Sequence, residues 1–241
     1  MTSLEQEIPK ALYLIPTGIN DDASPETYLT ESVLATVRKL KVFIVENEKS
    51  ARAFLKACKI ESPQSELQIF ELDKHDAKQN INGFLDHLKK GIATGLLSEA
   101  GCPAVADPGA RIVAAAHKAN IKVKPFIGPS SILLALMASG MEGQRFCFHG
   151  YIPIDRNERI KTLQQFERNA QQRNETQIFI EAPYRNNPLL KDILSNCNPE
   201  TKLCIAVNID TPSESIKTMR IQEWKKQIPE LHKMPVVFLM M

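Results

Sequence analysis

Short apolar segments of strand length alternate with segments of helical periodicity through the first half of the chain. The strand-like segments are residues 11–15, 42–46, 67–70, 94–97 and 123–127. The helix-like segments between them are residues 27–38, 51–58, 81–90 and 110–119. Repeated strand–helix units of this length are typical of a mainly parallel sheet with helices on both faces. We therefore predict an α/β domain over residues 1–126.

The second half of the chain, after Gly128-Pro129, has the same kinds of segment in different proportions. Helical patterns cover residues 132–138, 159–170 and 189–194, and the strand-like segments are 146–148, 177–180, 203–207, 215–221 and 236–240. Strands with so little helix between them favour a mixed sheet. We predict a second α/β domain over residues 127–241, so that the fold is two α/β domains with different sheets.

The five cysteines are odd in number and form no Cys-x-x-Cys pair, which argues against a disulfide framework and a zinc site. We therefore expect no metal centre and a cytoplasmic location. The longest apolar run, residues 132–138, is far shorter than the roughly 18 residues that span a bilayer. Met1–Lys10 has no apolar core, so we expect neither a signal peptide nor a membrane partner. A net charge of +2 gives no independent indication of nucleic-acid binding.

The stretch from Gly95 to Gly109 carries glycines, prolines and small residues directly after the strand-like segment 94–97. Glycine lets a backbone approach a ligand closely, and proline fixes the path of a loop. A small-residue loop at a strand end of an α/β protein is a usual place for a nucleotide-like ligand. An ordinary strand-to-helix connection has a similar composition, and for this segment alone both interpretations stay open.

Three more loops follow predicted strands, at residues 16–20, 46–49 and 128–131. In a parallel sheet all of these loops lie at the carboxyl edge and can converge on one pocket. Ser130 or Ser131 either caps the next helix or leaves its N-terminal amides to a ligand. Neither the dinucleotide-binding Gly-x-Gly-x-x-Gly nor the P-loop pattern occurs, which argues against NAD and ATP.

A series of motifs along residues 11–240 resembles the tetrapyrrole methylase superfamily. More narrowly, it resembles the branch that 2′-O-methylates a cytidine of small-subunit ribosomal RNA. The motifs are Pro16-Thr17-Gly18, Glu46, the segment from Ser98 to Pro103, Asp107-Pro108-Gly109, Gly128-Pro129-Ser130, Ser139-Gly140, the segment from Phe146 to Pro153, and Glu181-Ala182-Pro183-Tyr184-Arg185.

This resemblance implies two α/β domains that bind S-adenosyl-L-methionine in a cleft between them, and a homodimer. The cofactor-binding residues that it implies are Thr17, Gly18, Ala100, Gly101, Cys102, Val105, Ser130, Ser131, Glu181 and Ile209. Cys102 stands where the family has a threonine. We interpret it as a small residue of the pocket wall and not as a nucleophile.

Methyl transfer from a sulfonium needs the acceptor oxygen, the methyl carbon and the sulfur in line, and a ribose hydroxyl needs a base or an oriented polar group. Glu46 and Glu181 each end an apolar strand, where a carboxylate is costly unless it is paired or used. We name Glu46, Glu181 and Arg185 as catalytic candidates, with Arg185 holding a phosphate or pairing with Glu181. Asp107 is expected to be a turn residue and helix-entry cap.

Two charged features have simpler interpretations than catalysis or RNA contact. The family uses no histidine at the position of His149, so we predict no role for it as a base. The stretch 156–173 is either an RNA-facing patch or an exposed, salt-bridged helix, and the acidic residues among its basic ones favour the helix.

Two segments depart from the family pattern where the acceptor would lie. Residues 46–49 read Glu-Asn-Glu-Lys in place of Glu-Asp-Thr-Arg, and residues 207–211 read Val-Asn-Ile-Asp-Thr in place of Arg-Glu-Leu-Thr-Lys. The leading hypothesis is a methyltransferase whose partner is ribosomal RNA or the small ribosomal subunit. The alternatives are a small-molecule or other RNA acceptor with the same cofactor, and a cofactor-binding protein without turnover.

Overall fold

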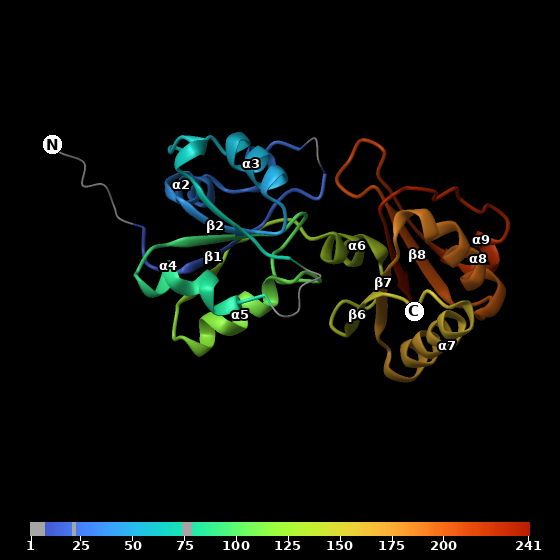
Figure 1. Cartoon of the computed structure of the whole chain (residues 1–241). Coiled ribbons are helices and arrows are strands. Elements are labelled where there is room, and N and C mark those ends of the chain that lie inside the picture. Colours follow the sequence, from blue (N-terminus) through green and yellow to red (C-terminus); the bar gives the residue numbers. More distant parts are fainter. Residues whose placement is uncertain (1–7, 21–22, 74–78) are drawn as a thin grey trace. The chain divides into compact units, whose positions relative to one another are not determined.

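A computed structural model describes residues 8–20, 23–73 and 79–241 of the chain. The chain forms two compact units, Met1–Ser130 and Ser131–Met241, here called unit 1 and unit 2 (Figure 1). Most of the N-terminal segment considered for a signal peptide, residues 1–7, lies outside the described residues.

Unit 1 contains a parallel sheet of five strands in the order β3-β2-β4-β1-β5. The strands are β1 (Leu12–Ile15), β2 (Val42–Val45), β3 (Gln68–Glu71), β4 (Thr94–Leu97) and β5 (Val123–Pro125). The helices are α1 (Pro25–Tyr28), α2 (Glu31–Lys39), α3 (Glu48–Ala57), η1 (Gln64–Glu66), η2 (Ile81–Leu85), α4 (Asp86–Lys89) and α5 (Gly109–Lys118). The predicted mainly parallel α/β sheet is confirmed.

Helices cover both faces of the unit 1 sheet, as Figure 1 shows for α2 and α3 on one face and α4 and α5 on the other. Strand residues therefore alternate between two cores. Tyr13 and Phe43 pack with the α2 and α3 side, whereas Leu12 and Ile44 pack with the α5 side. Because both faces are buried, the central strands are continuous apolar runs, the pattern that made them recognisable in the sequence.

Two helices of unit 1 differ from their predicted form. The segment 27–38 is two helices, because Leu29 and Thr30 adopt extended backbone angles between α1 and α2. The segment 81–90 begins as the 3₁₀ turn η2, in which the Asn80 side chain accepts a hydrogen bond from the Gly83 amide. The spacing of apolar residues indicates which face of such a segment is buried, but it does not show where the helical backbone is interrupted.

Unit 2 contains a mixed sheet of five strands in the order β6-β7-β10-β8-β9. The strands are β6 (Phe146–Tyr151), β7 (Thr176–Ile180), β8 (Lys202–Val207), β9 (Ser215–Arg220) and β10 (Val236–Met240). The helices are α6 (Ser131–Ser139), α7 (Arg156–Arg173), η3 (Pro183–Arg185), α8 (Asn186–Asn196) and α9 (Ile221–Trp224). Only β6 and β7 pair in parallel, and the other pairs are antiparallel, so the predicted mixed sheet is confirmed.

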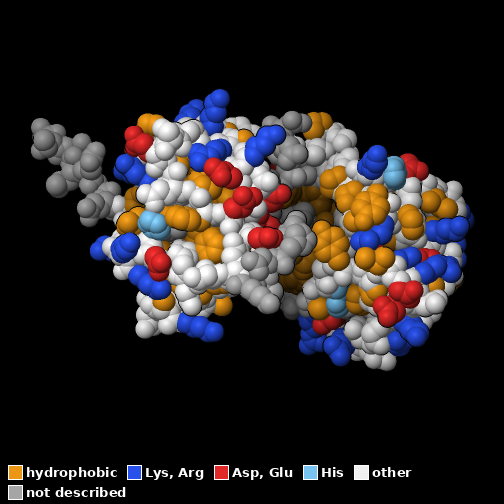
Figure 2. Space-filling model, viewed as in Figure 1, with side chains coloured by type: hydrophobic (Ala, Val, Ile, Leu, Met, Phe, Trp, Pro, Cys, Tyr) orange, Lys and Arg blue, Asp and Glu red, His pale blue; other side chains and the backbone are white. Residues whose placement is uncertain are grey.

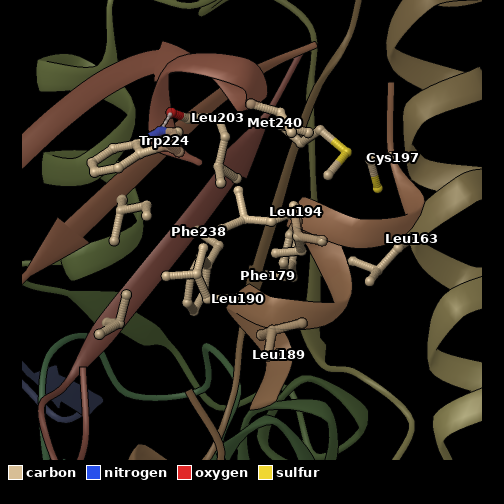
Figure 3. Packing of buried hydrophobic residues seen from close by; sticks show 14 of the residues in the cluster. Leu163, Phe179, Leu189, Leu190, Leu194, Cys197, Leu203, Trp224, Phe238 and Met240 are labelled. Carbon is tan, nitrogen blue, oxygen red and sulfur yellow. Dashed lines mark hydrogen bonds between the residues drawn. The ribbon is translucent and has the colours of Figure 1, made fainter. Parts of the chain in front are cut away.

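One large apolar core holds unit 2 together. Phe179 of β7 stacks on Phe238 of β10, with ring centroids 5.7 Å apart, and Leu189 and Leu190 of α8 cover this pair (Figure 3). The indole of Trp224 is buried, and its Nε1 donates a hydrogen bond to the carbonyl oxygen of Leu203 at 2.9 Å. Side chains of this size contribute about 1.5–3 kcal/mol each when fully buried. This core fixes the strand ends on which the unit 2 candidates lie.

Among the described residues, no helix has both the length and the apolar character needed to cross a membrane.

Candidate functional site

The loops after β1 and β4 are joined to each other at the carboxyl edge of the unit 1 sheet. The Thr17 amide donates to the Gly101 carbonyl at 3.0 Å, and the Gly101 amide donates back to the Thr17 carbonyl at 3.2 Å. The Thr17 hydroxyl donates to the Ser98 carbonyl at 3.3 Å, and the Ser98 hydroxyl donates to the Gly101 carbonyl at 2.9 Å. Two predicted cofactor residues are thus held together through their backbones.

Glycine is required at two positions of this edge. Gly101 has a φ of +73°, in the left-handed region that side chains disfavour. A Cβ at Gly128 would lie 2.2 Å from Cβ of Pro16, which is far inside van der Waals contact. The loops after β1 and β5 can therefore approach this closely only because Gly128 has no side chain.

The thiol of Cys102 forms a hydrogen bond to a neighbouring loop. Its Sγ donates to the Pro129 carbonyl at 3.3 Å and lies 3.9 Å from the Gly128 carbonyl oxygen. Burial raises the pKa of this thiol above its ordinary value, so the uncharged form is favoured at neutral pH. A protonated thiol in this position links the loops after β4 and β5, which agrees with a wall residue and not with a thiolate nucleophile.

The Glu46 carboxylate holds the β4–α5 loop. Its Oε1 accepts a hydrogen bond from the Glu99 amide at 3.1 Å. The neighbouring Asn47 caps α3 by accepting from the Ser50 amide, and the Ser50 hydroxyl donates to Glu99 Oε1 at 2.8 Å. Glu46 therefore has a positioning function in the fold, in addition to any contact with a substrate.

Asp107 acts as the predicted turn residue and helix-entry cap. Its Oδ1 accepts from the Gly109 amide at 2.7 Å, at the start of α5, and both of its carboxylate oxygens lie 2.9 Å from the Ala104 amide. Burial raises the pKa of this carboxyl, and the hydrogen bonds from the two amides partly oppose that rise. Ala104 and Ala106, with φ near +67° and +61°, show that this loop holds an unusual path.

The remaining unit 1 candidates lie on the same loops with different exposure. Ala100 and Val105 are exposed, Ser130 is half-buried, and Gly18 follows the buried Thr17. The structure therefore brings together Thr17, Gly101 and Cys102, while Ala100 and Val105 project from the loop that these residues hold.

In unit 2 the predicted residues lie at one edge of the mixed sheet. Strands β6, β7 and β8 run in the same direction, because β10 is antiparallel to both β7 and β8. Glu181 directly follows β7, and Ile209 lies in the turn after β8, where it is buried. Ser131 is the first residue of α6. Glu181 and Ile209 thus share an edge, as expected of strand-end residues.

Glu181 and Arg185 form an ion pair. Glu181 Oε1 accepts from Arg185 Nη2 at 2.6 Å and from the Ala182 amide at 2.7 Å. The Glu181 side chain is 1% exposed and that of Arg185 is 24% exposed. The hydrogen bond from Arg185 to Glu181 raises the pKa of the guanidinium further. Glu181 Oε2 is buried and has no hydrogen-bond partner among the described residues, so this carboxylate keeps an acceptor for a ligand.

His149 contacts a glutamine and a phenylalanine within unit 2. Its Nε2 lies 2.8 Å from the Gln177 side-chain oxygen, and its ring stacks on Phe166 with centroids 3.9 Å apart. The Gln177 amide nitrogen donates to the backbone and side chain of Glu175, which directs the oxygen towards His149. The imidazole therefore has a hydrogen-bond partner in Gln177 and packs on Phe166.

The charged helix α7 is anchored by ion pairs on one side. Arg159 is buried and donates from Nη2 to Asp192 of α8 at 2.7 Å, and Arg156 donates to the other oxygen of Asp192 at 3.0 Å. Asp155 caps the helix by accepting from the Asn157 and Glu158 amides. A salt-bridged helix describes α7, with the pairing directed to α8 rather than along the helix.

Sequence reasoning missed two exposed aromatic residues at the unit 2 edge. Tyr184 lies between Glu181 and Arg185, and the Arg185 guanidinium carbon is 5.2 Å from the centroid of its ring. Tyr151 ends β6 opposite Ile180. Both lie inside the quoted family motifs, but a motif does not reveal that a tyrosine is left in solvent.

No group of three or more His, Cys, Asp or Glu side chains suited to a metal ion occurs within the described parts of the chain.

Known proteins with similar sequences match most of the length of this chain. "Ribosomal RNA small subunit methyltransferase I" of Vibrio cholerae is 28% identical over 212 residues, covering 88% of this chain and 69% of the relative. The protein of the same name from Buchnera aphidicola subsp. Acyrthosiphon pisum is 27% identical over 231 residues, covering 95% and 77%.

Two solved structures share the fold. The methyltransferase CobJ has a TM-score of 0.60 and 19% identity, with 92% of this chain and 91% of that chain covered. Uroporphyrin-III-C-methyltransferase from Thermus thermophilus has a TM-score of 0.54 and 16% identity, with 96% and 94% covered. The family described as Tetrapyrrole (Corrin/Porphyrin) Methylases matches residues 11–225. The chain therefore belongs to the tetrapyrrole methylases and is a methyltransferase.

Proposed function

We propose that this chain uses S-adenosyl-L-methionine to 2′-O-methylate a ribose in small-subunit ribosomal RNA. The observation that carries the proposal is the joined edge of unit 1, where Thr17, Gly101 and Cys102 form a wall of backbone and small side chains. The similarity to proteins named ribosomal RNA small subunit methyltransferase I, over 88–95% of the chain, supports RNA as the acceptor.

The unit 1 edge fits a cofactor of this kind. At Gly101 a Cβ would lie 3.5 Å from both Ile19 Cγ2 and the Pro129 carbonyl oxygen, which is ordinary van der Waals contact, so the left-handed φ and not a clash favours glycine there. We assign the cofactor to Thr17, Gly18, Ala100, Gly101, Cys102, Val105 and Ser130, with Ser131, Glu181 and Ile209 of unit 2 as further contacts. The bound cofactor supplies an electrophilic methyl group.

The chain's own residues would orient the acceptor. We assign Glu181 the role of accepting a hydrogen bond through Oε2, from either the acceptor hydroxyl or the cofactor, because this buried oxygen has no partner among the described residues. Arg185, held by Glu181, would bind a phosphate. Glu46 is the candidate of unit 1, where its Oε1 already accepts a hydrogen bond from the Glu99 amide.

One observation favours keeping a second acceptor class. Asn47 and Asn208 stand where the family pattern has charges, and both serve local turns: Asn47 caps α3, and the Asn208 carbonyl accepts from the Thr211 amide. A small molecule or another RNA is therefore the alternative acceptor with the same cofactor.

Two further properties belong to the proposal. We propose a homodimer, to be tested by sedimentation of the purified chain at several concentrations. We also propose a cytoplasmic location, where thiols such as those of Cys58 and Cys204 stay reduced.

The deciding experiment incubates the protein and radiolabelled S-adenosyl-L-methionine with small ribosomal subunits, naked ribosomal RNA and a metabolite extract. Label in a ribose of the subunits or RNA is the expected result. Label found only in small molecules would show that the acceptor is a small molecule and not ribosomal RNA. Calorimetry with the cofactor and its demethylated product, performed in parallel, should detect binding of both. Absence of binding of both molecules would overturn the proposed cofactor and the reaction that depends on it.

A further inference from the structure

Two large aromatic side chains lie in solvent at the unit 2 edge that carries Glu181. Tyr151 is 65% exposed and Tyr184 is 61% exposed. Tyrosines bury a large area when they pack, so exposed ones beside a charged group point to a binding surface. Figure 2 shows hydrophobic side chains next to Lys and Arg side chains on the face of unit 2 in view.

A guanidinium lies over one of the two tyrosine rings, and the other tyrosine ends the neighbouring strand. Arg185 lies over the Tyr184 ring at 5.2 Å. Tyr151 ends β6 opposite Ile180, the residue before Glu181, so both tyrosines come from segments beside the Glu181–Arg185 pair. Glu181 occupies Nη2, whereas Nη1 makes no hydrogen bond with any residue in the described part of the chain. Arg185 is thus fixed in place and still has donors to offer.

A lysine is held beside this group by the loop before β10. The Lys233 amide donates to the Pro183 carbonyl at 3.0 Å, with Lys233 at a φ of +60°. Asn186 Nδ2 donates to the Met234 carbonyl at 2.8 Å, which ties the same loop to α8. The Lys233 side chain is exposed and forms no salt bridge with the described residues. Glu230, the nearest acidic residue in sequence, hydrogen-bonds Asn187.

We propose that Tyr151, Tyr184, Arg185 and Lys233 form a surface that binds a single-stranded stretch of RNA, with bases stacked on the tyrosines and phosphates on the two cations. The proposal rests on the proposed RNA acceptor and names the residues that would position it. Aromatic faces beside cations are the usual means of binding unpaired nucleotides. In a duplex, by contrast, the base faces are stacked on each other and cannot reach a tyrosine ring.

The test measures binding of a fluorescently labelled single-stranded oligoribonucleotide to the full chain by anisotropy. Tyr184→Ala should weaken binding roughly tenfold or more, because stacking is lost, whereas Tyr184→Phe should keep most of the affinity. Lys233→Ala should reduce the slope of log affinity against log salt by about 0.7, the value for one phosphate contact on a single strand. Phe146→Ala is the matched control: an exposed aromatic at the opposite end of β6, expected to have no effect.

Each outcome decides the proposal. Equal binding by wild type, Tyr184→Ala and Tyr151→Ala overturns it, even if ribosomal subunits are methylated, in which case the proposed function stands. Preference for the same sequence annealed as a duplex also overturns it. A uroporphyrin, a flat ring with carboxylates, is the competing ligand: if it binds through Tyr184 and the oligoribonucleotide does not, both this inference and the RNA acceptor fail. Calorimetry with S-adenosyl-L-methionine should be unchanged in Tyr184→Ala.

Discussion

The two units present their strand-end residues in opposite ways. In unit 1 the edge is made of backbone: Thr17 and Gly101 exchange amide hydrogen bonds, and the Glu46 and Asp107 carboxylates accept from loop amides. In unit 2 the edge presents side chains: a buried carboxylate, a guanidinium and two exposed tyrosines. The difference shows that unit 1 presents a rigid surface of backbone and small residues, whereas unit 2 presents polar and aromatic side chains.

The largest expected effect is on the side-chain edge. Arg185→Ala leaves the carboxylate of Glu181 buried with only the Ala182 amide, and loss of one partner of a buried pair should cost about 3 kcal/mol of unfolding free energy. Denaturant unfolding followed by Trp224 fluorescence, the chain's single tryptophan, reports on unit 2. The exposed Arg220–Glu200 pair is the control, since Arg220→Ala should cost below about 1 kcal/mol. If Arg185→Ala and Arg220→Ala lowered the free energy of unfolding equally, burial would not make the Glu181–Arg185 pair more important for stability than the exposed pair.

The backbone edge is tested by two glycines with similar angles. Gly101→Ala and Gly140→Ala place a Cβ at φ of +73° and +67°, so each should cost about 1–2 kcal/mol of stability. No described residue lies within 4 Å of a Cβ at Gly140, whereas at Gly101 the Cβ would project towards Ile19 and Pro129. Calorimetry should show weaker cofactor binding for Gly101→Ala alone. Weakening in both variants would mean that strain, and not the wall, determines affinity.

A smaller effect is expected from the charge of Asp107. Burial raises its pKa in the folded state, so the folded protein favours the protonated carboxyl and loses stability as pH rises from the ordinary value of 3.8 through the raised one. Asp107→Asn keeps a side-chain oxygen and does not titrate. Its stability relative to wild type should therefore improve between about pH 4 and pH 7, measured by urea unfolding. A relative stability that falls over this range would contradict the burial argument.

The smallest effect is expected at Cys102. Cys102→Ser keeps a donor to the Pro129 carbonyl and should change methyl transfer and stability little, within about 0.5 kcal/mol. Iodoacetamide should modify Cys102 slowly at neutral pH and should spare Cys58, whose pKa burial raises to about 12. Loss of turnover in Cys102→Ser without loss of cofactor binding would make the thiol a participant in the reaction.

Much of the fold could be predicted from the sequence, because strands buried on both faces, such as β1 and β2, are continuous apolar runs. The direction of β6 relative to β7 and the place of β10 between β7 and β8 could not, since long-range pairing leaves no local pattern. For the site, family motifs placed Glu181 and Arg185 in one segment, and the structure adds that they pair. The tie from Glu46 to the Glu99 amide joins residues of two strand ends and has no sequence signature.

The bridge between Thr17 and Gly101 joins residues that are 84 positions apart (101 − 17) in the sequence. Contacts of such separation form late in folding, because the entropy of closing a long loop has to be overcome before they are made. The wall proposed to bind the cofactor is therefore complete only in a fully folded unit 1, and any molecule that binds it selects that state. Bound cofactor at a hundred times its dissociation constant would add about 2.7 kcal/mol to stability. Unit 1 should consequently become more resistant to proteolysis as the cofactor concentration rises.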